Sequence, residues 1–202
     1  MAIRRVRLAA TTAILLSSLL GGCSFMEDLL GISEPVEIES VDPDSGIRSS
    51  GDDSLNLGLR SDEGDIQLSP PLNWQQTEGL HRNADLQLVR PAEDLYTLVL
   101  AEDKNNLDKF TLENNATTYR RLLIAGLDQF IEETPTEVDL VNSNNAVQYV
   151  IEGIYDEVPI TYLHTTVATQ RAYYQIISWT QADQFDQHVD EFQQIANSFR
   201  EN

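Results

Sequence analysis

The stretch AVQYVIEGIYDEVPITYLHTTVATQRAYYQIISWT, residues 146–180, decides the fold class of this chain. It contains three runs rich in β-branched and aromatic residues, at 146–154, 160–168 and 172–180. Such residues favour strands. The linkers between the runs are only a few residues long, whereas parallel strands need a crossover of roughly a dozen residues or more. The stretch therefore predicts three neighbouring antiparallel strands.

Further strand patterns lie upstream of this stretch, at 86–89, 95–100 and 137–141. The run at 95–100 is apolar at both odd and even positions, which predicts a strand covered on both faces. Together with the three runs downstream, these segments predict one antiparallel sheet.

Two segments have the apolar spacing of three and four residues that is typical of amphipathic helices. The first covers residues 119–131 and is expected to end before Pro135, because the residue before a proline disfavours helix. The second closes the chain, with an apolar stripe at Phe185, Val189, Phe192, Ala196 and Phe199. We expect Phe192 and Phe199 to be buried against the sheet. The element order predicts an α+β fold, an antiparallel sheet flanked by helices.

The last strand, YYQIISWT, and the terminal helix, ending FQQIANSF, follow a long helix and an antiparallel meander. This combination resembles the PsbP-like and DcrB-like proteins over about residues 72–202. The resemblance implies an α/β/α sandwich around an antiparallel sheet. It also implies a protein that is not an enzyme, since family members are mostly extrinsic or assembly factors of photosystem II, or envelope lipoproteins of obscure role. No binding motif at the level of single residues comes with it.

The N-terminus, residues 1–22, has the features of a cleavable signal peptide. Three arginines precede an apolar stretch at 8–20, which is too short for a permanent span of roughly 20 residues. The sequence LGGC at 20–23 is a lipobox, and Cys23 is the only cysteine in the chain. We expect Cys23 to carry the diacylglycerol and palmitate of a lipoprotein. It would hold the protein on the extracytoplasmic side of an outer membrane, plasma membrane or thylakoid membrane facing the lumen.

The chain is strongly acidic, with 33 Asp and Glu against 13 Lys and Arg and a formal net charge of −20. Such a surface repels phosphate backbones and anionic headgroups, so we expect no nucleic-acid partner and no membrane contact besides the lipid. Residues 24–64 are rich in Asp, Glu, Ser and Gly and predict a flexible tether after Cys23. Residues 65–202 predict a single domain.

Catalytic signatures are absent from the sequence: it contains no glycine-framed serine, phosphate-binding loop, dinucleotide fingerprint or zinc-protease helix. Cys23 is reserved for lipid and cannot serve as a nucleophile. The segment 42–46 alternates aspartates before a glycine, but Asp53 stands where a calcium loop needs glutamate. We expect no enzyme activity, no catalytic residue and no cofactor.

His188 and Glu191 lie three residues apart on the predicted terminal helix, with Asp190 beside them. Imidazole and carboxylate suit zinc or manganese, but two ligands do not close a site. We expect a solvated polar face there and no metal site. His164 is expected in the core or at a strand edge, and His81 in a loop.

Aromatic residues form the other candidate site. Trp74, Tyr173, Tyr174 and Trp179 could line a pocket or a partner surface, although aromatics in strands more often belong to the core. Tyr173 and Trp179 share one face of the last strand and Tyr174 takes the other. At least one of those faces must be covered by a helix or a partner.

The leading hypothesis is a non-catalytic accessory lipoprotein that presents an acidic PsbP-like domain to a protein partner at a membrane surface. In a photosynthetic host, that partner would be a photosystem or its assembly machinery. The first alternative is an envelope lipoprotein of the DcrB-like kind that binds a ligand or metal. The second is a hydrolase with an unrecognised site.

Overall fold

The computed structural model describes residues 58–106 and 110–202. The predictions for the signal peptide, for Cys23, for the aspartates at 42–46 and for the tether up to residue 57 lie outside these residues. None of the helices in the described residues is both long and apolar enough to span a membrane.

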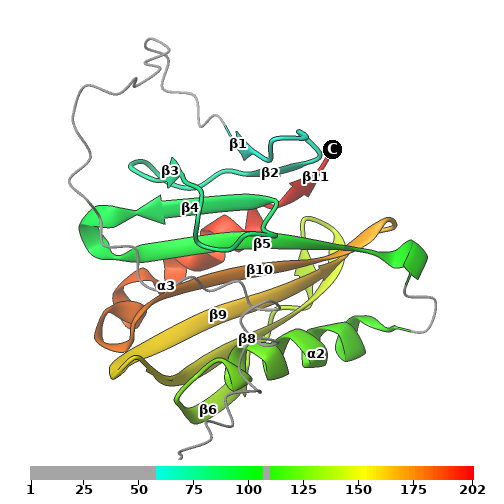
Figure 1. Ribbon diagram of the computed structural model, residues 1–202. Coiled ribbons are helices and arrows are strands. Elements are labelled where there is room, and N and C mark those ends of the chain that lie inside the picture. Colours follow the sequence, from blue (N-terminus) through cyan, green and yellow to red (C-terminus); the bar gives the residue numbers. More distant parts are fainter. Residues whose placement is uncertain (1–57, 107–109) are drawn as a thin grey trace, which may run out of the picture.

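The larger sheet is antiparallel and runs in the order β3-β4-β5-β10-β9-β8-β6, with β7 also pairing with β8 (Figure 1). The three runs of the stretch 146–180 form its centre as β8, β9 and β10. Its strands are β3 (Gln75–Gln76), β4 (Leu86–Arg90), β5 (Leu95–Asp103), β6 (Gln129–Pro135), β7 (Leu140–Val141), β8 (Asn144–Tyr155), β9 (Val158–Ala168) and β10 (Ala172–Gln181).

A smaller sheet lies beside the larger one, in the order β1-β2-β11. It consists of β1 (Leu59–Arg60), β2 (Ile66–Leu68) and β11 (Arg200–Glu201). Short 3-10 turns follow β4 (Pro91–Glu93) and β5 (Lys104–Asn106). The small sheet therefore joins the start of the described chain to its end, because β2 pairs with both β1 and β11.

Helices cover both faces of the larger sheet. α2 (Leu112–Ala125) lies on one face and α3 (Ala182–Asn197) lies behind the other (Figure 1). The side chain of Thr111 caps α2 by accepting a hydrogen bond from the backbone N–H of Asn114 at 3.2 Å. This architecture confirms the predicted α+β class, and it means that both faces of the last strand are covered.

The face toward α3 carries the larger apolar cluster. Phe192 and Phe199 are fully buried there, as expected. They pack with residues of both sheets, including Ile66, Leu68, Leu163 and Ile176. Trp74 joins this cluster edge-on to Phe192, with ring centroids 6.3 Å apart, so its predicted place in the core is confirmed.

The first helix was predicted wrongly at both ends. It begins at Leu112 rather than Tyr119, and it ends at Ala125 rather than continuing to residue 131. Gly126 closes it by donating its N–H to the carbonyls of Leu122 and Leu123. The chain then turns and pairs with β8 as β6, because the edge of a sheet supplies hydrogen bonds that override the local apolar spacing.

Two other boundaries also differ from the sequence pattern. Of the strand predicted at 137–141, only Leu140–Val141 pairs with β8. The domain boundary expected at Asp65 falls between β1 and β2, which pair through Leu59 and Leu68. Leu59 packs against the larger core cluster, so part of the expected tether is structured.

Candidate functional site

The outer edge of the larger sheet is the first candidate site. Within the described residues, β6 is the last strand on its side and pairs with β8 alone. All seven of its residues are exposed. Phe130 and Ile131, which the sequence pattern had placed in the first helix, are 44% and 50% exposed. A strand edge with exposed apolar side chains is a surface to which another chain can add a strand.

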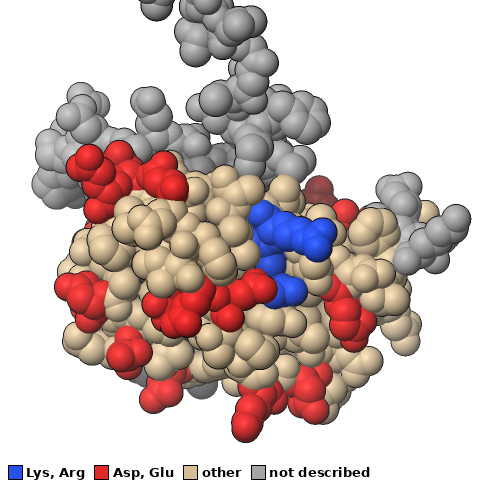
Figure 2. Space-filling model, turned by 90° about the horizontal axis from the view of Figure 1, so that it is seen from below, with Lys and Arg blue, Asp and Glu red and all other residues tan. Residues whose placement is uncertain are grey.

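The same strand contains features that limit its pairing. A bulge interrupts its register with β8 between Phe130 and Glu132, and Pro135 ends it. Glu132 and Glu133 supply carboxylates, and Glu133 forms an ion pair with Arg120 of α2 at 2.7 Å. Figure 2 views the molecule from below and shows acidic side chains scattered over this end, with Lys and Arg gathered in a compact patch.

The second candidate site is an apolar cavity of about 140 Å³ between α2 and the sheet. Its walls include Leu98, Tyr162, Ile177 and Trp179 from the sheet and Leu122 and Leu123 from α2. Trp179 is held in place by stacking on Tyr96, with ring centroids 5.2 Å apart and an interplanar angle of 16°. The sequence allowed a pocket lined by Trp179, and the cavity places it in one.

Three tyrosines, Tyr119, Tyr155 and Tyr162, are among the residues that line this cavity. Burial, together with the charges of Glu102 and Asp85, raises the pKa of Tyr119 to about 12. Burial also raises the pKa of Tyr162, with a smaller contribution from Tyr155. These tyrosines are therefore neutral hydrogen-bonding groups at neutral pH, and negative charge stands near the Tyr119 end.

A chain of buried polar side chains runs beside the cavity, from β9 to the rim of α2. His164 Nε2 donates to Gln175 Oε1 at 2.8 Å, and the hydroxyl of Thr166 donates to the same oxygen at 2.7 Å. Gln175 Nε2 then donates to Asn115 Oδ1 at 2.6 Å, and Asn115 Nδ2 donates to Glu102 at 2.6 Å. The donors follow one direction along the chain, and the Glu102 carboxylate accepts the last hydrogen bond.

His164 is fully buried, which confirms its predicted place in the core. Its Nε2 donates to Gln175, so Nδ1 is an unprotonated acceptor, and Nδ1 has no hydrogen-bond partner among the described residues. Burial lowers the pKa of His164 to about 4; the hydrogen bond to Gln175 opposes the shift and the charge of Arg120 adds to it. His164 is therefore neutral at pH 7.

The face of α3 with His188 and Glu191 is not the solvated surface expected from the sequence. Both side chains are largely buried. Glu191 Oε1 accepts hydrogen bonds from Trp74 Nε1 and from Arg90, both at 2.6 Å. Its other oxygen lies 3.6 Å from His188 Nδ1. The expectation was wrong because it considered one helix, while the partners of Glu191 come from residues before and within β4.

In residues 58–106 and 110–202, no group of three or more His, Cys, Asp or Glu side chains is arranged to hold a metal ion.

His81 lies in a loop, as predicted, but is buried and helps to line the cavity. Tyr173 and Tyr174 are buried on opposite faces of β10. Tyr173 donates to the carbonyl of Phe110 at 2.7 Å.

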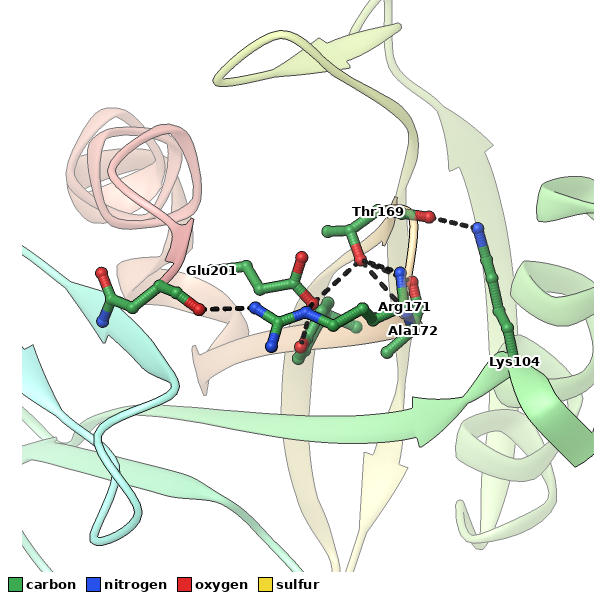
Figure 3. Close-up of polar contacts among 7 residues, drawn as sticks. Lys104, Thr169, Arg171, Ala172 and Glu201 are labelled. Atoms are coloured by element: carbon green, nitrogen blue, oxygen red, sulfur yellow. Dashed lines mark hydrogen bonds and ion pairs between the residues drawn. The ribbon is translucent and has the colours of Figure 1, made fainter.

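Polar contacts join β11 to the turn between β9 and β10 (Figure 3). Glu201 Oε1 accepts hydrogen bonds from the hydroxyls of Thr169 at 3.1 Å and Tyr174 at 2.7 Å. Arg171 Nε lies 3.3 Å from the same oxygen, and Lys104 donates to the carbonyl of Thr169. Sequence reasoning missed this cluster, because its members are far apart in the chain. Its hydrogen bonds and ion pair tie the end of the chain to the turn between β9 and β10.

No family model matches the chain, and no curated protein matches it. Solved structures do resemble it. Cyanobacterial PsbP (CyanoP) from Synechocystis sp. PCC 6803 aligns with a TM-score of 0.52 at 13% identity, over 80% of this chain and 100% of that chain. A crystal structure from Bacteroides thetaiotaomicron VPI-5482 aligns with a TM-score of 0.52 at 7% identity, over 72% of this chain and 48% of that chain.

LpqN, described as involved in cell envelope biogenesis of Mycobacterium tuberculosis, aligns at 14% identity over 66% of this chain and 81% of its own. Its TM-score of 0.47 is too low to carry an argument. At these identities the matches show the fold alone. Together with the antiparallel sheet held between α2 and α3, the match to CyanoP shows that the chain has the PsbP-like fold.

Proposed function

We propose that this chain is a non-catalytic accessory lipoprotein of the cell envelope that binds a protein partner through β6. The observation that carries the proposal is the exposed edge of the larger sheet, with Phe130 and Ile131 half-exposed on a strand that pairs on one side. Strand addition at this edge would give main-chain hydrogen bonds, and the two apolar side chains would give contact area.

Charge indicates what kind of partner would bind. Antiparallel pairing of β6 with a second copy of itself would bring Glu132 and Glu133 close to the same residues of the other copy, and like charges that face each other across strands are destabilising. The net charge of −20 adds long-range repulsion between copies. The partner is therefore a different protein, with an extended segment that carries Lys or Arg beside apolar residues.

A photo-crosslinking amino acid at position 131 would test this interface in the native host. The matched control places it at Leu72, which is 86% exposed but lies outside β6. We expect position 131 to crosslink to one defined protein through a segment with Lys or Arg, and Glu132→Lys with Glu133→Lys to abolish the product. Equal crosslinking at both positions, or a product made of two copies of this chain, would refute the proposal.

The membrane anchor is a separate part of the proposal. The lipobox at 20–23 supports lipidation of Cys23, and acyl chains in combination give stable anchoring where one alone is marginal. Cys23→Ser should move the protein from the membrane fraction to the soluble fraction. Retention of this variant on membranes after a high-salt wash would contradict the lipid anchor.

In a photosynthetic host, we propose that the partner belongs to a photosystem or to its assembly machinery. The PsbP-like fold that the chain shares with CyanoP supports this choice. Fractionation of solubilised membranes on a density gradient would decide it. The protein should migrate with the photosystem, and Ile131→Lys should return it to the light fractions.

A further inference from the structure

We propose that the cavity between α2 and the sheet is a binding site for an uncharged apolar group about the size of a benzene ring. It would take either a small aromatic molecule or the end of an acyl chain. This site is separate from the β6 edge, and the inference does not depend on the proposed partner.

The size and lining of the cavity carry the first step. Its volume is about 140 Å³, and an engineered apolar cavity of about 150 Å³ remains dry and binds benzene or xenon. The walls are mainly Leu, Ile, Tyr and Trp side chains. Water in such a site would find few hydrogen-bond partners, so an apolar guest is favoured.

The opposite face of the sheet is packed differently. There, large buried aromatic side chains such as Phe192 and Phe199 fill the space between α3 and the sheet. On the α2 side, Leu122 and Leu123 leave room beside Ile177. One larger side chain on α2 would occupy that room, so the sequence keeps an open site on one face of the sheet.

Charge selects the chemistry of the guest. The carboxylates of Glu102 and Asp85 act on Tyr119, which lines the cavity and hydrogen-bonds to Glu102. A guest that carried a carboxylate into this end would face both charges and would lose its own hydration. The edges and faces of Trp179 and Tyr162 suit an aromatic ring, and an acyl end also fits an apolar wall.

Titrations with benzene, 1-octanol and octanoate would test the site. The protein is the mature chain with Cys23→Ser, which keeps every described residue and needs no detergent. We expect benzene or octanol to raise the melting temperature saturably and to change the fluorescence of Trp179. The affinity for octanoate should be lower than the affinity for octanol by at least roughly tenfold. Tighter binding of benzene would assign an aromatic guest, and tighter binding of octanol an acyl chain.

Substitutions locate the site. Leu122→Phe narrows the cavity from α2 and Leu100→Phe narrows it from the sheet, so each should weaken binding of the better probe at least roughly tenfold. Leu112→Phe places the same side chain on α2 outside the cavity and should leave binding unchanged. If Leu122→Phe fails to fold, Leu100→Phe alone tests whether the probes bind in the cavity.

The proposal is overturned if neither neutral probe binds saturably, or if the folded cavity variants bind as tightly as the unmodified chain. Equal affinity for octanoate and octanol would overturn the requirement for an uncharged guest. Loss of the β6 crosslink has no bearing on these results, because Ile131 does not line the cavity.

Discussion

The two faces of the larger sheet are built differently. In the described part of the chain, the face toward α3 carries a cluster of 19 buried apolar residues that reaches into the small sheet, whereas the face toward α2 carries a cluster of six. The α2 face has instead the apolar cavity and the polar chain from His164 to Glu102. One face is closed by packing, and the other keeps space and polar groups inside.

Buried polar atoms without a hydrogen-bond partner are also distributed unequally between the two faces of the larger sheet. Among the residues that the structure describes, Arg120 Nε, His164 Nδ1 and Thr180 Oγ1 are buried side-chain atoms without a hydrogen-bond partner. The first two lie on the α2 side. Buried polar groups without partners lower stability, so we expect the α3 face to provide most of the stability of the domain.

The largest expected effect comes from breaking the α3 face. Phe192→Ala removes a fully buried ring that contacts Trp74 and Phe185, and such losses typically cost about 3–5 kcal/mol. Leu122→Ala on the α2 side enlarges an existing cavity at a half-buried position and should cost about 1 kcal/mol. Urea unfolding measures both. Equal losses would show that the two faces contribute alike.

A pH titration of stability tests one buried residue on the α2 face, His164. The pKa of His164 is about 4 in the folded chain and about 6.5 when unfolded. Between those values the unfolded state binds a proton that the folded state excludes. The contribution of His164 to the free energy of unfolding is therefore fully present above pH 6.5. About 3 kcal/mol of it is lost as the pH drops to 4.

The control for this titration is His164→Leu. Carboxylates titrate in both proteins near the acid end, so the difference between the two curves isolates the histidine. The variant should lose less stability between pH 6.5 and 4 than the unmodified chain. Parallel curves would show that His164 does not titrate in this range.

Glu191 tests whether the α3 helix contributes packing alone. Glu191→Gln keeps the shape but weakens the pairing with Arg90 and the acceptor for Trp74. Because the pair is largely buried, we expect a loss of about 1–3 kcal/mol. His188→Ala should cost less, about 1 kcal/mol or below. A rise in melting temperature with zinc that requires His188 would restore the metal hypothesis.

The smallest expected effect concerns the small sheet, which extends the α3 cluster. A chain that begins at Asp65 loses β1 and the packing of Leu59, whereas a chain that begins at Gly58 keeps both. We expect the shorter chain to be less stable by about 1 kcal/mol. Thermal unfolding compares them. Identical transitions would place the start of the domain at Asp65, as the composition predicts.

Sequence reasoning succeeded where the local pattern and the tertiary packing agree. The alternation in β8, β9 and β10 and the stripe of α3 predicted the centre of the sheet and the burial of Phe192 and Phe199. It failed at residues 126–131, where the spacing of apolar residues suits a helix. Phe130 and Ile131 lie in a strand because β8 has an edge to pair with.

The candidate sites show the same limit. Glu102, Asn115, His164 and Gln175 come from β5, α2, β9 and β10, and nothing in the spacing of these residues predicts that they form one hydrogen-bonded chain. Glu191 was assigned to solvent because its partners Trp74 and Arg90 lie about a hundred residues away.

By itself, the sequence determined the class of the fold, since side-chain periodicity and short linkers restrict which strands and helices can form. It also determined the acidic charge and the candidate lipobox, which are properties of composition and of a contiguous motif. Only the tertiary structure decided which edge stays open, where the cavity lies and which polar groups share hydrogen bonds. Those features depend on contacts between residues far apart in the chain, and local sequence does not encode which distant partner each side chain meets.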